Sequence, residues 1–214
     1  MANATPPVYT EEKLGKLALK ADTAAERKNW SRAIKYGERT FLASSFLYEK
    51  NDLRYITHHK NLNRYYDKAG RIREASEGIK EAYLLSKQHL DPKHNVSTIN
   101  RLLYYKLLIK EQNYADAIPI VLENIALLSS NKEDSFRLYH YLKQLYSLYA
   151  FTGNLEKEEQ TLIKFLNLDK WLVDSNRQEN LNVIIQLAKN YCKQDKIEEF
   201  NALVASHKLD YFCK

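Results

Sequence analysis

The sequence predicts an all-α protein built as an array of about five similar helix pairs. The chain of 214 residues contains only five Gly and four Pro, so long stretches lack residues that break helices. A common turn recurs with anchor residues that are 42, 42, 41 and 42 residues apart: Ala33, Ala75, Ala117, Glu158 and Phe200. Apolar residues recur at helical spacing on both sides of each turn. A fixed period in this range is typical of stacked supersecondary units.

The helix pairs are expected in five consecutive segments after a flexible N-terminal segment, 1–9. We expect them to form one solenoid domain, 10–214, with units at about 10–50, 51–91, 92–132, 133–173 and 174–214. Thr10, followed by Glu11 and Glu12, supplies an N-cap and acidic residues for the first helix. Gly70 stands at the turn of the second unit, where a helix end commonly needs positive φ.

The later units show the same pattern around their turns. Leu103 and Leu107 precede the turn of the third unit, which follows the chain break expected at 91–92 (Asp-Pro). Gly153 stands at the turn of the fourth unit, between two apolar-periodic runs. In the fifth unit, Leu187 and the other apolar residues lie on one helical face. Because the turns are short, the helices of each pair are expected to be antiparallel.

Charge and composition narrow the class of function. The 33 basic and 27 acidic residues give a net charge of +6 and are interspersed along the chain. An even mixture of the two charges is typical of a solvated surface, so nucleic acid is an unfavoured partner. No apolar run is long enough to span a bilayer, and no signal peptide is visible. Cys192 and Cys213 form no CxxC pair; they slightly favour a cytoplasmic location but do not exclude export or excision from a larger protein.

No catalytic signature is found. The sequence has no glycine-rich phosphate loop, no HExxH and no GxSxG motif, so we expect no enzymatic activity, no cofactor and no metal. His58 and His59 are adjacent, and neighbours on a helix point about 100° apart, which does not suit one metal ion.

The second unit resembles a tetratricopeptide (TPR) repeat. Ala75 follows Gly70 and Ile72, and Leu62 and Tyr66 precede them, as in that family. The resemblance extends over the whole chain. The 42-residue period resembles the longer variety, as in kinesin light chains and the sensory regions of some bacterial regulators. The family resemblance implies a right-handed superhelix whose first helices line a concave groove for extended peptides.

The groove expected from this resemblance is mainly basic and aromatic. It is formed by Lys60, Arg64, Leu102, Tyr105, Lys106, Tyr139, His140, Lys143 and Lys189. From the second unit onward no carboxylate falls at the groove positions, and a line of cations in a concavity attracts acidic ligands. The competing interpretation is that these cations are ordinary solvated residues of a Lys-rich chain.

We therefore expect a non-enzymatic scaffold that binds a peptide or partner segment, with a bias toward acidic ligands. The main alternative is a sensory or regulatory input module of a larger signalling protein that acts through oligomerisation. The apolar chain end supports that alternative, because Leu209, Tyr211 and Phe212 offer a candidate homodimer contact. RNA binding along the basic helices is a weaker alternative.

Overall fold

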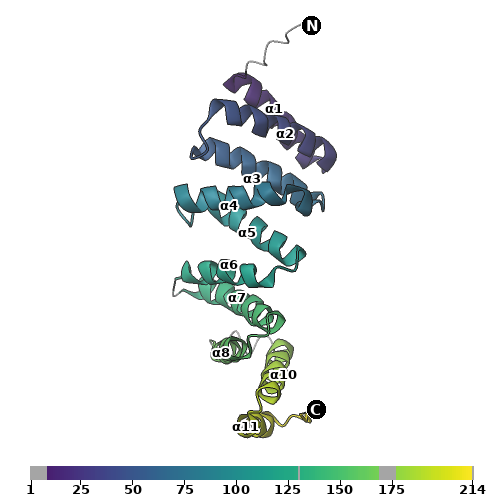
Figure 1. Cartoon of the computed structure of the whole chain (residues 1–214), viewed down its shortest axis with the longest axis vertical. Helices are drawn as coiled ribbons and strands as arrows, with labels where there is room; N and C mark the ends of the chain where they lie inside the picture. Colours follow the sequence, from purple (N-terminus) through teal and green to yellow (C-terminus); the bar gives the residue numbers. More distant parts are fainter. Residues whose placement is uncertain (1–8, 130, 169–176, 214) are drawn as a thin grey trace. The chain divides into compact units, whose positions relative to one another are not determined.

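A computed structural model describes residues 9–129, 131–168 and 177–213, without the side chains of 177 and 179. Within these ranges the chain is all-helical and contains no strand. Figure 1 shows the helices in chain order, coloured from purple to yellow. The N-terminal segment expected to be flexible lies, apart from residue 9, outside the described residues.

The chain divides into two compact units, Met1–Gln112 and Asn113–Lys214. The division falls at the turn of the third predicted helix pair. The expected continuation of one array across this point stays a prediction, and each unit is described by itself.

Unit 1 contains two complete helix pairs and the first helix of the third. Its elements are α1 (Glu11–Glu26), α2 (Trp30–Leu47), α3 (Leu53–Lys68), the 3₁₀ turn η1 (Ile72–Ala75), α4 (Ser76–His89) and α5 (Asn95–Lys110). Each helix packs against the next along the chain, and α3 also packs against α5. The chain break at Asp91-Pro92 is confirmed, since α4 ends before it and α5 begins after it.

Unit 2 begins with the second helix of the third pair. Its elements are α6 (Tyr114–Ala126), α7 (Lys132–Phe151), α8 (Leu155–Leu166), α10 (Arg177–Lys193) and α11 (Ile197–His207). Consecutive helices again pack together, including α8 with α10. A core cluster of this unit is built around Leu142, Leu162, Phe165 and Leu187, which are at most 3% exposed.

A residue with left-handed backbone conformation stands at the turn of every predicted pair. These residues are Lys28, Gly70, Gln112, Gly153 and Asp195, with φ of 55°, 74°, 61°, 71° and 56°. Their residue numbers are 42, 42, 41 and 42 apart, which matches the spacing of the anchor residues. The positive φ expected at Gly70 and Gly153 is confirmed. The other three positions carry side chains that tolerate this conformation less well.

Most helix starts carry a side-chain cap. Thr10 accepts a hydrogen bond from the backbone N–H of Lys13 at 3.3 Å, which confirms the predicted cap of α1. Asn29 and Asn154 cap α2 and α8 in the same way. These bonds satisfy N–H groups that have no partner inside the helix, so at the capped helices the sequence defines where the helix begins.

Candidate functional site

An open hollow of about 390 Å³ lies between α1 and α3 in unit 1. It is lined by Asp22, Ala25, Glu26, Trp30, Asn61, Arg64, Tyr65 and Lys68. Its volume is within the range of pockets that hold small ligands or single side chains. The α1 side carries two carboxylates, and the α3 side carries two cations, so the hollow has opposite charges on its two walls.

The aromatic floor of the hollow is fixed by a hydrogen bond between the two helices. Tyr65 is 8% exposed, and its hydroxyl donates to the Asp22 carboxylate at 2.6 Å. Burial, and then the hydrogen bond to Asp22, raise the pKa of Tyr65, so its hydroxyl stays protonated and keeps donating. The hydrogen bond from Tyr65 also uses the Asp22 carboxylate, one of the two acidic groups on the α1 wall. Glu26 is therefore the carboxylate on this wall without such a partner among the described residues.

Lys60, expected to line the groove, is instead buried with 7% exposure. Burial, and then the nearby Arg64 charge, lower the pKa of Lys60, because both disfavour the ammonium form. Arg64 follows one turn later on α3, is exposed and lines the hollow; its expected role in a peptide groove stays a prediction. The expectation that Lys60 presents its charge at an open surface is wrong. Lys60 does not line the hollow, so it can influence a ligand there only by long-range electrostatic attraction or repulsion.

The expected basic surface on α5 is partly neutralised. Lys106 pairs with Asp67 of α3, with 2.8 Å between Nζ and Oδ2. Asp67 does not fall at one of the repeated groove positions, and it reaches Lys106 because α3 packs against α5. Leu102 is 51% exposed and Tyr105 is half-buried, so both remain available at the surface of α5.

The expected groove residues of unit 2 have different environments. Tyr139 is 3% exposed and packs on Phe165, with 4.6 Å between the ring centroids. Its assignment to a binding surface is wrong, because its position on α7 faces the core. His140, the next residue, is exposed, since a single step along a helix turns a side chain by about 100°. Lys143 is half-buried and Lys189 is exposed.

A polar network joins α8 to the fifth helix pair. Glu158 stands where the repeat usually has a small residue and is fully buried. Its carboxylate accepts hydrogen bonds from Gln186 at 2.7 Å and Asn190 at 3.0 Å. Asn190 also donates to the backbone carbonyl of Leu155 at 2.9 Å. These donors make the buried carboxylate acceptable in the core, because a buried charge needs hydrogen-bonding partners.

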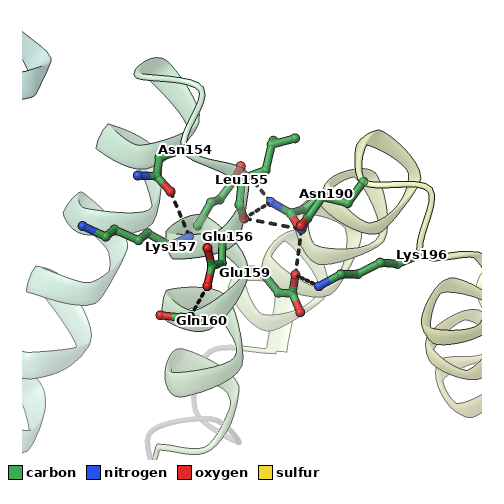
Figure 2. A network of polar contacts seen from close by, with 10 residues as sticks. Asn154, Leu155, Glu156, Lys157, Glu159, Gln160, Asn190 and Lys196 are labelled. Carbon is green, nitrogen blue, oxygen red and sulfur yellow. Dashed lines mark hydrogen bonds and ion pairs between the residues drawn. The ribbon is translucent and has the colours of Figure 1, made fainter.

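The network continues to the surface through a second carboxylate. Gln194 donates to Glu159 at 2.7 Å, and Lys196 pairs with the same carboxylate at 2.6 Å. Figure 2 shows this part of the network around Asn190, Glu159 and Lys196. The sequence marked Glu158 only as a departure from the repeat. The amides on α10 that bond to it could not be read from spacing, since they depend on how α10 packs on α8.

The C-terminal tail folds back onto unit 2. Cys192 and Cys213 form a disulfide with 5.5 Å between their Cα atoms, a pairing that the sequence left unassigned. Tyr211 is half-buried against the core cluster and lies 6.2 Å from the Phe200 ring. Phe212 remains 77% exposed. Of the three residues expected at an oligomer contact, Phe212 is therefore the most available, and Leu209 and Tyr211 are partly covered.

Other classes of site have little support in the described part of the chain. Its His, Cys, Asp and Glu residues form no group of three or more that would suit a metal ion. None of its helices combines the length and apolarity that a bilayer span requires. His59 is 2% exposed and stacks on Phe41, which makes it a core residue.

Comparison with solved structures gives similarity over almost the whole chain. The TPR-like, nearly identical repeats of a proposed kinesin light chain from Podosopora anserina match with a TM-score of 0.59 and 13% identity, covering 92% of this chain and 94% of that chain. A single-substitution variant of that protein matches with a TM-score of 0.59 and 14% identity, with coverages of 92% and 96%. The fold is a TPR-like repeat solenoid. The sequence matches no protein-family model and no curated protein.

Proposed function

We propose that this chain is a non-enzymatic interaction scaffold that binds a segment of a partner protein in the hollow between α1 and α3. The hollow carries the proposal, because it combines an aromatic floor, charged walls and a volume of about 390 Å³. Ligand sites are usually concave and combine apolar contact with a few convergent polar groups. The TPR-like fold supports a scaffold over an enzyme.

The ligand that suits the hollow carries an acidic group next to an apolar one. Arg64 and Lys68 form the cationic wall, and a guanidinium binds a carboxylate in two-point geometry. Trp30 and Tyr65 offer apolar contact to the adjacent ligand side chain. Glu26, on the opposite wall, repels a uniformly acidic peptide. The bias toward acidic ligands is therefore local to the α3 wall and does not extend along a continuous basic groove.

The test uses a peptide-display library and a fluorescence readout. Trp171→Phe leaves Trp30 as the remaining tryptophan of the chain, so its emission reports occupancy of the hollow. Selected peptides are expected to contain Asp or Glu beside an apolar residue. Arg64→Glu should weaken their binding by about tenfold or more, equivalent to about 1.4 kcal/mol.

The matched control is Lys80→Glu, which makes the same change of charge on an exposed residue of α4, in the same unit. It should leave affinity within about twofold, since Lys80 does not line the hollow and an exposed charge is screened by salt. Equal loss in the two variants would mean that general charge attraction accounts for binding. The proposal would be overturned if the selected peptides bind without changing Trp30 emission and if Arg64→Glu leaves their affinity unchanged.

A second candidate function is self-association through the chain end. One observation favours it, the exposed Phe212 ring next to the disulfide-bonded Cys213. Light scattering coupled to size exclusion should then give a dimer that Phe212→Ser converts to a monomer. A monomer before the substitution would remove this candidate and leave the peptide hypothesis untouched.

A further inference from the structure

A second hollow in unit 1 lies at the turn between α1 and α2. Its charged lining residues are all basic, whereas the first hollow has both acidic and basic residues. Its volume is about 360 Å³, and its lining residues are Leu19, Lys20, Thr23, Ala24, Arg27, Asn29 and Arg32. Three of these residues are cationic and none is acidic. The residues from α1 are not those that line the hollow against α3, so the two hollows lie on different faces of that helix.

The three cations lack counter-charges of their own. Within the described residues, no carboxylate is ion-paired with Lys20, Arg27 or Arg32, although other basic residues of this unit, such as Lys16 and Arg54, do have such partners. Residues 1–8 contain no Asp or Glu and so add no neutralising charge. Like charges that converge without a counter-ion leave a local positive potential.

An aromatic ring holds two of the cations in place. The Lys20 ammonium lies 5.7 Å from the centroid of the Tyr36 ring, and the Arg32 guanidinium lies 5.6 Å from it. The Lys20 contact joins α1 to α2, the Arg32 contact lies within α2, and the two orient both cations without neutralising them. The Arg32 hydrogen bond, and then its charge, lower the pKa of Tyr36, which is consistent with a positive local potential.

The hollow also has room for more than an inorganic ion. The Leu19 side chain is 68% exposed at its edge, and the Ala24 methyl group adds further apolar lining. Asn29 caps α2 with its side-chain oxygen, so its amide group remains a hydrogen-bond donor. Two guanidinium groups and one ammonium suit a doubly charged oxyanion better than a single carboxylate.

We propose that this hollow is a binding site for a phosphomonoester, in which Arg27, Arg32 and Lys20 hold the phosphate and Leu19 contacts its organic part. Nothing in this proposal depends on the peptide hollow, because the two sites share no lining residue. The phosphate could belong to a small organic molecule or to a phosphorylated residue of a peptide, and both present the same group.

The experiment measures binding to the full chain by isothermal titration calorimetry, at constant ionic strength. The probes are inorganic phosphate, phenyl phosphate, benzoate, a short phosphoserine peptide and its unphosphorylated form. Phenyl phosphate should bind at least about tenfold more tightly than inorganic phosphate or benzoate, since it alone supplies both the dianion and the apolar group. The two phosphorylated probes distinguish the sources: the tighter binder identifies a free metabolite or a modified protein.

Two variants assign the binding to this hollow. Arg27→Gln with Arg32→Gln should reduce affinity for phenyl phosphate by about 100-fold, if each charge-assisted contact contributes about tenfold. The α2 cap is preserved, because Asn29 bonds to the backbone N–H of Arg32. Lys80→Gln removes an exposed charge elsewhere in unit 1 and should leave affinity unchanged, with circular dichroism confirming that both variants fold.

Two results would overturn the assignment. The first is an absence of saturable phenyl phosphate binding at concentrations up to about 10 mM, which is weaker than a functional site needs. The second is an equal loss of binding free energy per removed charge in the Lys80→Gln variant, which loses one cation, and the double variant, which loses two; binding would then follow net charge alone.

Discussion

The left-handed turn residues allow a direct test of how the helix pairs are held at their turns. Lys28 adopts φ of 55°, whereas the equivalent residue of the next pair is Gly70, with φ of 74°. A side chain in this conformation costs about 1–2 kcal/mol, and glycine loses about 0.4–1 kcal/mol more backbone entropy on folding. Lys28→Gly should therefore stabilise unit 1 by about 0.5–1 kcal/mol.

The reverse substitution isolates the backbone contribution. A Cβ added at Gly70 would meet no atom within 4 Å, so Gly70→Ala introduces left-handed strain without a clash. It should destabilise the protein by about 1 kcal/mol. Gly15→Ala in α1 is the control, since its Cβ also meets nothing within 4 Å but its backbone is helical. That change should stabilise by about 0.5–1 kcal/mol.

Urea unfolding followed by circular dichroism measures all three variants against the parent chain. The slope with denaturant should stay constant, so a shift in midpoint reports stability. The reasoning is refuted if the two Gly→Ala variants shift the midpoint in the same direction, or if Lys28→Gly lowers it. Either result would mean that backbone conformation does not decide the energetics of these turns.

Three further predictions concern buried groups and the tail. Burial lowers the pKa of His59 to about 4, so the folded protein binds fewer protons than the unfolded chain between pH 6.5 and 4. About 3 kcal/mol of stability should therefore be lost as the pH falls through that window. In urea titrations at several pH values, His59→Gln should remove this contribution and leave the part of the slope due to His58, whose pKa burial also lowers. The Cys192–Cys213 disulfide closes a loop with a sequence separation of 21, so its reduction should lower the free energy of unfolding by about 3 kcal/mol in urea. The stability of a Cys192→Ser/Cys213→Ser protein should not change with reductant. Glu158→Ala should lower the free energy of unfolding by about 3 kcal/mol in urea, because Asn190 loses a buried hydrogen-bond acceptor. Glu158→Gln should lower it less, because it keeps a carbonyl oxygen. Equal losses in the two variants would contradict the network.

Much of the fold was predictable because the residues that begin, end and separate the helices act locally and recur in successive units. The turn glycines, the cap at Thr10 and the break at Asp91-Pro92 all act within a few residues of the chain. The same applies to the apolar faces, which follow from helical spacing. The structure confirms the all-helical class and both turn glycines, Gly70 and Gly153.

The site was less predictable because it depends on contacts between helices. Arg64, predicted from its position in the repeat, lines the hollow between α1 and α3, but Lys106 is paired with an aspartate from another helix. Tyr139 shows how sensitive such assignments are, since one residue along α7 separates a buried ring from an exposed imidazole. Trp30 was missed because it begins α2, whereas the prediction considered only the first helix of each pair. Lys68 lies one turn beyond Arg64 on the same face of α3, but the prediction ended that face at Arg64.

The cross-link between α10 and the tail also affects how the chain responds to mechanical force. If the protein is stretched through its two ends, the segment between Cys192 and Cys213 cannot lengthen while the disulfide is intact. Those residues then contribute only the 5.5 Å between the two Cα atoms to the extended contour. Once the bond is reduced, the same segment adds roughly 70 Å of extended chain. The oxidation state of one cysteine pair therefore sets how far unit 2 extends under load.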